Sequence, residues 1–213
     1  MNTARHTILD TIRHSLGRTK LDEVTRQQLL DRFTHPNIHT QPAFEESLID
    51  KFLLQLEKAV GTVHQVESSI AIPNAVLDFL QKYHFPQRVV MDAHLKSLAW
   101  PAELDIAYRQ ALPDDKLSVT GAFAGVAETG SLVLLSSENS PTTLNFLPEA
   151  HIVVLFAQDI VAHIEDVWPR LREIPTPRTV NFITGPSRTA DIEQTLQLGA
   201  HGPKKLHVIL VAK

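Results

Sequence analysis

The chain has 213 residues, of which 43% are hydrophobic and 21% charged, a composition typical of one globular α/β domain with room for a helical extension. The net charge of −4 gives no reason to expect nucleic acid or a membrane surface as the main partner. Because the sequence contains no cysteine, it excludes disulfides, thiolate nucleophiles and cysteine-bound zinc or iron–sulfur clusters within this chain.

Export and membrane insertion are not expected. No stretch approaches the roughly 18 consecutive apolar residues that a membrane-spanning helix needs. The amphipathic start MNTARHTILDTIRHSLGR also lacks an apolar signal-peptide core. We therefore expect a cytoplasmic protein with no membrane span.

Residues 1–60 are expected to form an N-terminal helical arm. Ile8, Ile12 and Leu16 recur at helical spacing before a glycine, and a second helix is predicted within residues 21–33. The strongest amphipathic pattern covers residues 43–60 and ends at a glycine. Such an arm either packs on the main domain or holds a second subunit or a partner.

From Gly61 onward, short strands alternate with helices, which predicts one α/β domain over residues 61–213. Strands are expected at TVHQV, QRVVMD, LDIAY, KLSVTGAFAGVAETGSLVLLS, AHIVVLFA, RTVNFITG and KLHVILVA, and helices at NAVLDFLQKY, DIVAHIEDVWPRL (with Asp159 at its start) and TADIEQTLQL. The apolar run AHIVVLFA is typical of a strand buried on both faces. This alternation predicts a mainly parallel sheet with helices on both faces.

A lone carboxylate, Glu128, stands in the glycine-rich stretch TGAFAGVAETG. No Lys or Arg occurs between Leu117 and Pro169, so an anion bound here would need backbone N–H groups or cations from elsewhere in the chain. Glu128 could serve as a general base, a nucleophile or a ligand-facing acceptor. The alternative is that it only accepts hydrogen bonds from loop amides and holds the turn.

The stretch ITGPSRTADIEQ combines the end of a strand with the expected start of a helix. Ser187 or Thr189 is predicted to cap that helix, with Asp191 and Glu193 near its first turn. Loops at the carboxyl ends of parallel strands bind ligands in α/β sheets, so Arg188 is a candidate for holding a carboxylate or phosphate. The alternative is a surface arginine beside capping residues.

A third candidate is His201 in LGAHGPKKLHV, which could act as an acid, a base or a ligand clamp, or could be an ordinary turn residue. We expect three loops to converge at one end of the parallel sheet: the Glu128 loop, Gly185–Arg188 and His201–Pro203. Arg188 would then be the countercharge of Glu128. A metal site is not expected, because the eleven histidines occur singly and no HExxH motif is present.

Four stretches, in this order, resemble the LUD-domain family over residues 61–213: TGAFAGVAETGSLVL, PEAHIVVLFAQDIV, NFITGPSRTADIE and GAHGPKKLHVILV. The resemblance implies a Rossmann-like three-layer α/β/α sandwich, similar to the sugar-phosphate isomerase and CoA-transferase group. It also implies a role in the oxidation of L-lactate to pyruvate, which lets bacteria grow on lactate. Family members of this type work beside two iron–sulfur proteins, and a chain without cysteine fits a component that carries no cofactor itself.

The family offers no secure catalytic assignment, but its motifs map onto a candidate pocket for a small anion. Its candidate residues are Glu128 for catalysis and Thr129, Gly130, Thr184, Gly185, Ser187, Arg188, Asp191, His201 and Gly202 for binding. Glu138-Asn139 is similar to the nucleophile motif of class I CoA-transferases, although Ser140 stands where that motif has glycine.

Three functions stay open. The first, which we prefer, is a non-redox component of an L-lactate-oxidising assembly. The second is a CoA-transferase-like or isomerase-like enzyme that uses Glu128 or Glu138. The third is an assembly scaffold with a vestigial pocket, in which residues 1–60 hold the partners. A homo-oligomer is compatible with each of them.

Overall fold

The computed structural model describes residues 3–18, 21–34, 40–189 and 197–212. The chain divides into two compact units, Met1–Pro42 and Ala43–Lys213. The first unit contains two of the expected helices, α1 (Thr3–Ser15) and α2 (Glu23–Thr34). Ion pairs between residues three apart support each helix, Arg13 with Asp10 in α1 and Arg26 with Glu23 in α2.

The third expected helix, α3 (Leu48–Lys58), belongs to the second unit. Ser47 caps its start, since the Ser47 hydroxyl accepts a hydrogen bond from the Asp50 N–H at 3.1 Å. Phe52 and Leu56 are fully buried in the core of the second unit. The α/β unit therefore begins ahead of α3, at residue 43, whereas the sequence placed this helix in the arm.

A six-stranded sheet forms the centre of the second unit, in the order β1-β12-β7-β4-β2-β3, and every neighbouring pair in it is parallel. Its strands are β1 (Thr62–Val66), β2 (Arg88–Met91), β3 (Asp105–Ala107), β4 (Leu117–Gly121), β7 (Ala150–Phe156) and β12 (Lys205–Val211). The mainly parallel α/β sheet predicted from the alternation of elements is confirmed.

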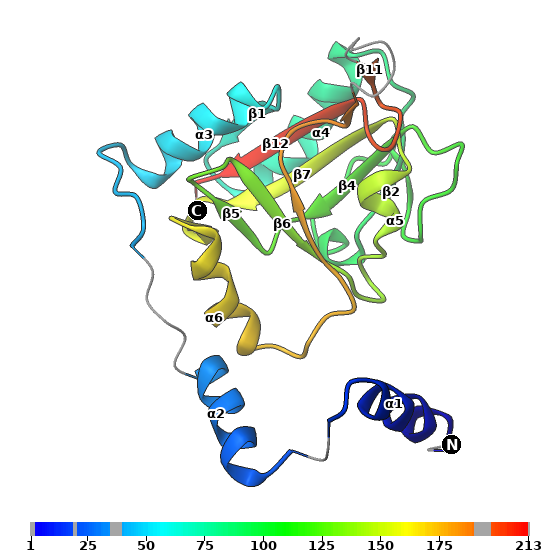
Figure 1. Cartoon of the computed structure of the whole chain (residues 1–213). Coiled ribbons are helices and arrows are strands. Elements are labelled where there is room, and N and C mark those ends of the chain that lie inside the picture. Colours follow the sequence, from blue (N-terminus) through cyan, green and yellow to red (C-terminus); the bar gives the residue numbers. More distant parts are fainter. Residues whose placement is uncertain (1–2, 19–20, 35–39, 190–196, 213) are drawn as a thin grey trace. The chain divides into compact units, whose positions relative to one another are not determined.

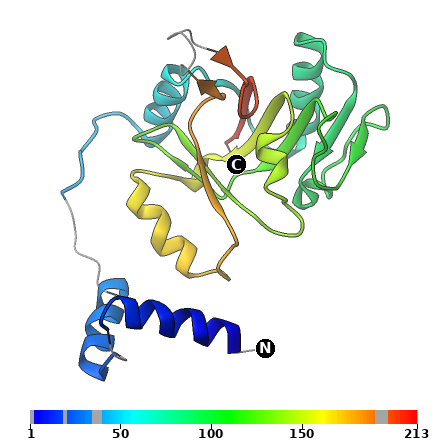
Figure 2. The ribbon, with the colours of Figure 1, turned by 45° about the vertical axis from the view of Figure 1, so that its right-hand side comes forward.

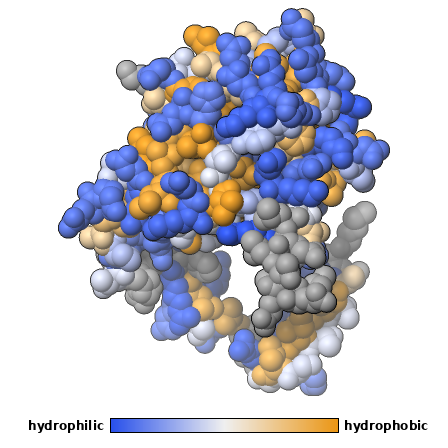
Figure 3. Space-filling model, turned by 90° about the horizontal axis from the view of Figure 1, so that it is seen from above, coloured by the Kyte–Doolittle hydropathy of each residue, from blue (hydrophilic) through white to orange (hydrophobic). Residues whose placement is uncertain are grey.

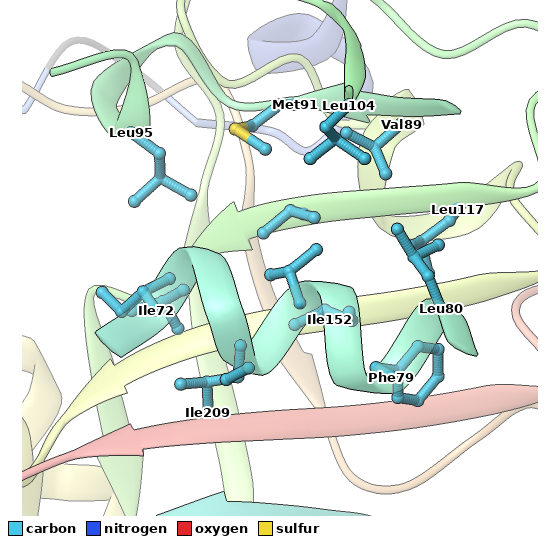
Figure 4. Packing of buried hydrophobic residues seen from close by; sticks show 14 of the residues in the cluster. Ile72, Phe79, Leu80, Val89, Met91, Leu95, Leu104, Leu117, Ile152 and Ile209 are labelled. Atoms are coloured by element: carbon cyan, nitrogen blue, oxygen red, sulfur yellow. The ribbon is translucent and has the colours of Figure 1, made fainter. Parts of the chain in front are cut away.

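One face of this sheet is covered by α4 (Ile72–Lys82). Successive side chains of a strand point to opposite faces, so Ile152 of β7 and Ile209 of β12 both point to the face covered by α4 and pack in one cluster with its side chains, as Figure 4 shows. Each such side chain, fully buried, stabilises the fold by about 1.5–3 kcal/mol through the hydrophobic effect. The alternate side chains of the same strands point to the other face.

That other face is covered by α3 together with a second, four-stranded sheet in the order β8-β5-β6-β9. Val153 and Leu155 of β7 pack there with Phe52 of α3 and Leu132 of β6. The strands of this sheet are β5 (Ala124–Val126), β6 (Ser131–Leu135), β8 (Ile160–Val161) and β9 (Val180–Ile183). In Figure 1, β9 crosses in front of the six-stranded sheet. The second face thus carries a helix and a sheet, where the sequence predicted helices alone.

The helix α6 (Val167–Arg172) begins later than predicted, because Ile160–Val161 form β8 and pair with β5. Asp159 does not cap it. Its carboxylate instead accepts a hydrogen bond from the Arg170 guanidinium at 2.7 Å, within α6. Val167 packs on the outer face of the second sheet, and Figure 2 shows α6 beside those strands.

The sequence also predicted a helix that starts near Ser187. The described residues at the two ends of this predicted segment are not helical. Arg188–Thr189 (β10) is extended and pairs antiparallel with Gln197–Leu198 (β11). The segment between them, with Asp191 and Glu193, lies outside the described residues.

Short elements complete the second unit. The helix α5 (Thr143–Phe146) buries Leu144 against Val90 and Ala111. The 3-10 helices are Ser69–Ala71, Ala93–Leu95, Ala157–Asp159 and Ile164–Asp166. Within the described ranges, no helix is both long enough and apolar enough to cross a bilayer. The face seen in Figure 3 carries hydrophobic patches among hydrophilic residues.

Candidate functional site

The strand order creates a switch point between β4 and β2. The chain leaves β2 toward β3 on one side, and it leaves β4 toward β7 on the other. Where two neighbouring connections diverge in this way, a crevice opens outside the carboxyl ends of the strands, and α/β proteins bind ligands there. A cleft of about 1030 Å³ lies at this point, bordered by Asp92 after β2 and by Gly121 at the end of β4.

Asp92 and His94 form a hydrogen-bonded pair in the wall of this cleft. Asp92 is buried, and its Oδ1 accepts hydrogen bonds from the His94 N–H at 2.8 Å and from His94 Nδ1 at 2.7 Å. The His94 side chain remains 58% exposed. A carboxylate only accepts, so this contact holds the imidazole as the tautomer protonated on Nδ1. Nε2 is then the nitrogen that can exchange a proton with a molecule in the cleft.

The remaining wall of the cleft is rich in hydroxyl groups and carries one exposed arginine, Arg178. The hydroxyl-bearing residues are Ser136, Ser137, Ser140, Thr142, Thr176 and Thr179. The SSENS stretch forms a tight turn, in which the Ser137 hydroxyl accepts from the Ser140 N–H at 3.0 Å. The Asn139 carbonyl also accepts from the Ala93 N–H at 2.9 Å, which fixes this turn beside Asp92. Glu138 is exposed on the same wall.

Glu128 lies elsewhere, and the protein itself occupies both of its carboxylate oxygens. Oε2 accepts from His163 Nδ1 at 2.8 Å, and Oε1 accepts from the Ile164 N–H at 2.9 Å. The Glu128 N–H in turn donates to the Ala162 carbonyl at 3.1 Å. The glutamate therefore ties the β5–β6 turn to the segment that leads into α6.

The charge of Glu128 is favoured by these contacts. Partial burial alone would raise the pKa of Glu128, but the hydrogen bonds from His163 and Ile164 and the nearby His163 charge outweigh it and lower the pKa below 4.5. A carboxylate of lowered pKa with both oxygens engaged is a poor base and a poor nucleophile. The geometry matches the alternative in which Glu128 holds a turn.

The glycines of the Thr129-Gly130 and Thr184-Gly185 pairs serve the packing of α3. Gly130 has a φ of +68°, and a Cβ atom there would lie 2.4 Å from the Leu56 nitrogen. Gly185 has a φ of +76°, and its Cβ atom would lie 2.1 Å from the Ala59 carbonyl oxygen. Both positions combine a left-handed backbone with direct backbone contact, which only glycine allows. Close to them, hydroxyl contacts join Thr129 to Ser131 and Ser131 to Thr184.

The structure groups the other predicted residues around a smaller cavity of about 270 Å³. Thr184, Gly185, Ser187 and Arg188 line it together with the His201–Pro203 loop. The two loops are joined by a hydrogen bond of 2.8 Å from the Ser187 N–H to the Pro203 carbonyl. Glu128, Thr129 and Gly130 do not line this cavity, and the side chain that contacts the Glu128 carboxylate is His163 rather than Arg188.

This cavity also differs in position from the expected one. It lies near His151, the second residue of β7, and Leu206, the second residue of β12. These are the amino ends of the parallel strands, opposite the switch-point cleft. Thr184–Arg188 follows β9, which belongs to the antiparallel part of the second sheet, so the rule for carboxyl ends of parallel strands does not apply to it.

Several polar residues of the two cavities were not singled out from the sequence, among them Asp92, His94, Asn145, His151 and Arg178. For the first two a signal existed, because the letters DAH follow a buried strand directly. For Asn145 and His151 no local signal existed, since their burial depends on packing between distant segments. In the described part of the chain, no cluster of three or more His, Cys, Asp or Glu residues could hold a metal ion.

The chain is similar to known proteins of one domain family. Residues 49–211 match the LUD domain. An uncharacterized protein of Neisseria meningitidis is 32% identical over 56% of this chain and 52% of its own length, so the match spans about half of that relative. Lactate utilization protein C of Anoxybacillus flavithermus is 36% identical, over 45% of this chain and 43% of its own length.

Two further comparisons cover most of the chain. Lactate utilization protein C of Geobacillus kaustophilus is 28% identical over 97% of this chain and 95% of its own length. A crystal structure of a DUF162 family protein from Deinococcus radiodurans is similar with a TM-score of 0.62 at 21% identity, covering 80% of this chain and 99% of that one. The last likeness supports the fold, and the domain match decides the family. This chain belongs to the LUD domain family.

Proposed function

We propose that this protein is a non-redox component of the cytoplasmic machinery that oxidises L-lactate to pyruvate, acting with iron–sulfur partner proteins. The observation that carries this proposal is the alignment of nearly the whole chain, 97% and 98% of it, with two relatives named Lactate utilization protein C. The sequence has no cysteine to bind a cluster. The two electrons released from lactate would therefore leave through partners.

The switch-point cleft is our proposed site of substrate contact. L-lactate carries a carboxylate, for which Arg178 is the cation in the cleft, and a hydroxyl group, which loses its proton as the ketone forms. Nε2 of His94, with the ring held by Asp92, would accept that proton. The oxidation releases two electrons and two protons in total, and the electrons and the second proton would pass to the redox partners.

Growth on L-lactate as the sole carbon source tests the proposal. Deleting the gene in a strain without a paralogue should abolish growth, and the wild-type gene should restore it. His94→Gln and Arg178→Gln should each fail to restore it. Arg172→Gln, at an exposed position outside the cleft, should restore it fully. Normal growth of the deletion strain would refute the role in lactate oxidation, and full complementation by His94→Gln would refute the role of the cleft.

One observation favours a CoA-transferase-like activity as the alternative: Glu138 is exposed in the wall of the same cleft. The carboxylate of an exposed glutamate could attack the thioester carbonyl to give an acyl–glutamyl anhydride and free CoA thiolate. Attack of that thiolate on the glutamyl carbonyl would then release the carboxylic acid and leave a glutamyl–CoA thioester. Incubation with acyl-CoA followed by mass spectrometry would detect this adduct, and Glu138→Gln should abolish it. If no adduct forms and Glu138→Gln restores growth on L-lactate fully, this alternative is excluded.

A further inference from the structure

A groove lies along one edge of the six-stranded sheet, between the edge strand β1 and the carboxyl end of α4. Two adjoining hollows of about 340 and 190 Å³ form this groove, and they share the lining residues Thr62, Phe79 and Tyr83. Neither hollow shares a lining residue with the switch-point cleft. The groove is therefore a separate feature, and its volume suits a small organic molecule.

Two histidines stand in this groove where the same strands carry apolar residues farther along. Alternate side chains of a strand share a face, so His207 of β12 lies on the same face as Ile209, which belongs to the core under α4. Likewise, His64 of β1 shares its face with Val66 of that core. Packing alone would favour apolar side chains at both positions.

His207 offers an acceptor to the groove, although its residue is only 8% exposed. The Thr62 hydroxyl donates to the Leu206 carbonyl at 3.3 Å, and its oxygen lies 2.8 Å from His207 Nδ1. A hydroxyl carries a single hydrogen, so Nδ1 donates in the second contact and Nε2 is the acceptor of the ring. Nε2 has no hydrogen-bond partner in the described chain and is not sealed from solvent, so a molecule in the groove can reach it.

The His207 ring is neutral near neutral pH. Burial, and then the nearby charges of His64 and Lys82, lower the pKa of His207 to about 4. Nε2 therefore keeps its lone pair, and the molecule that pairs with it must bring a hydrogen-bond donor such as a hydroxyl group.

The groove also carries two lysines without an acidic partner. Lys82 Nζ lies 5.4 Å and Lys205 Nζ 4.3 Å from the centre of the Tyr83 ring, so both ammonium groups stand beside the same side chain. Neither lysine forms an ion pair in the described chain. Asp78, one turn before Lys82 on α4, is the one acidic residue among the described lining residues, so the lysines outnumber it. The charges in the groove therefore favour an anion.

We propose that this groove binds a small phosphate ester that carries a free hydroxyl group, with the phosphate at Lys82 and Lys205 and the hydroxyl donating to His207 Nε2. Nucleoside monophosphates and polyol phosphates share this chemistry. Lysine binds phosphate as a point charge, and a doubly charged phosphate interacts with two ammonium groups more strongly than a carboxylate does. The site is separate from the cleft assigned above to lactate oxidation, and it does not depend on that assignment.

Calorimetric titration of the full chain at about pH 8, where phosphate esters are doubly charged, tests this site. The probes are AMP and glycerol 3-phosphate. Methyl phosphate lacks the free hydroxyl group, and adenosine and glycerol lack the charge. We expect saturable binding of AMP, of glycerol 3-phosphate or of both, and the probe that binds identifies the class of ester. The three comparison compounds should bind at least about tenfold more weakly.

Variants of exposed side chains locate the binding. Lys82→Gln and Lys205→Gln should each weaken binding at least about threefold, and the double variant at least about tenfold. Asp78→Asn removes a repelling charge and should tighten binding about twofold. Lys96→Gln is the matched control, because Lys96 also lies over a tyrosine ring, 5.6 Å from the centre of Tyr108, but outside the groove. It should leave the affinity unchanged.

The proposal is overturned if neither hydroxylated ester binds, if methyl phosphate binds as tightly as the ester that does, or if Lys96→Gln weakens binding as much as Lys82→Gln. Unchanged or weaker binding by Asp78→Asn would also contradict it. The readout is affinity alone, so a failure of cleft variants to affect growth on L-lactate would refute the proposed function and leave this site standing.

Discussion

At the scale of single residues, position in the fold reverses the importance of two acidic side chains. Glu128 stands out in the sequence because no Lys or Arg lies near it. In the structure it accepts hydrogen bonds from His163 and Ile164 and holds a turn. Asp92 does not stand out, yet it is buried and orients a half-exposed histidine in the switch-point cleft. Burial and partners decide the chemistry of a carboxylate, and residue type alone does not.

Replacing Glu128 by Gln should lower the free energy of unfolding by about 1–2 kcal/mol at neutral pH, because two hydrogen bonds lose their charged acceptor. The pKa of Glu128 in the folded protein lies below its ordinary 4.5, so as the pH falls the unfolded chain takes up the proton first. The stabilisation is therefore complete above about pH 4.5 and is lost as the pH falls through the folded-state pKa.

Urea denaturation at several pH values checks this expectation. The difference between wild type and Glu128→Gln should be constant near neutral pH and should shrink in acid. Glu138→Gln, at an exposed position, serves as the control and should match the wild type throughout. Equal stability of Glu128→Gln and wild type at neutral pH would contradict the structural role.

At the scale of elements, α3 packs on the face of the six-stranded sheet that also carries the second sheet, for which the sequence predicted helices alone. Its Phe52 and Leu56 fill the core between β7 and β6. Its last turn touches the backbone at Gly130 and Gly185. The Thr129-Gly130 and Thr184-Gly185 pairs, which in the sequence suggested ligand loops, therefore have a packing explanation: they let two turns approach the same helix.

Gly130→Ala and Gly185→Ala should each destabilise the protein by about 3 kcal/mol. Each substitution adds a Cβ atom at a positive φ and drives it into backbone, that of α3 for Gly130 and that of Ala59, directly after α3, for Gly185. Gly121→Ala is the matched control, because nothing lies within 4 Å of its Cβ position. Thermal unfolding would show lower midpoints for the first two variants and a nearly unchanged midpoint for the control. Unchanged midpoints at Gly130 and Gly185 would show that α3 does not pack as described.

At the scale of the whole molecule, the second unit contains every buried cluster in the described chain. The described members of these clusters all lie between Phe44 and Val211, within the second unit. The two cavities belong to this unit as well. The first unit, with exposed Ile8 and Ile12 in α1 and exposed Leu16 just after it, is thus available for a different task.

A chain truncated before Ala43 should fold and unfold cooperatively with a midpoint close to that of the full chain. If residues 1–42 hold the redox partners, the truncated chain should no longer co-purify with them from lactate-grown cells. Circular dichroism melting measures the first expectation and affinity purification with mass spectrometry the second. Co-purification of the truncated chain at full yield would exclude a partner-holding role for the first unit. Loss of cooperative unfolding in the truncated chain would contradict the expectation that the second unit folds without the first.

The sequence by itself determined the elements whose signal is local. The apolar runs at β7 and β12 indicated buried strands, and the helical spacing of Ile8, Ile12 and Leu16 indicated a helix, and the structure has β7, β12 and α1 in these places. The four ordered motifs also pointed correctly to the LUD domain family. Composition alone showed that no thiolate could bind a cluster in this chain.

Only the tertiary structure decided what depends on contacts between distant segments. Strand order placed the switch point beside Asp92 and His94, at the carboxyl ends of the parallel strands. The Thr184–Arg188 loop lies at the opposite, amino ends of the strands. Ile160–Val161 became a strand because β5 offered an open edge, which no local periodicity reports. Register and pairing are cooperative properties of segments far apart in the chain, whereas periodicity describes one segment at a time. For that reason the sequence predicted many of the elements and the family, whereas the tertiary structure determined which residues face each cavity.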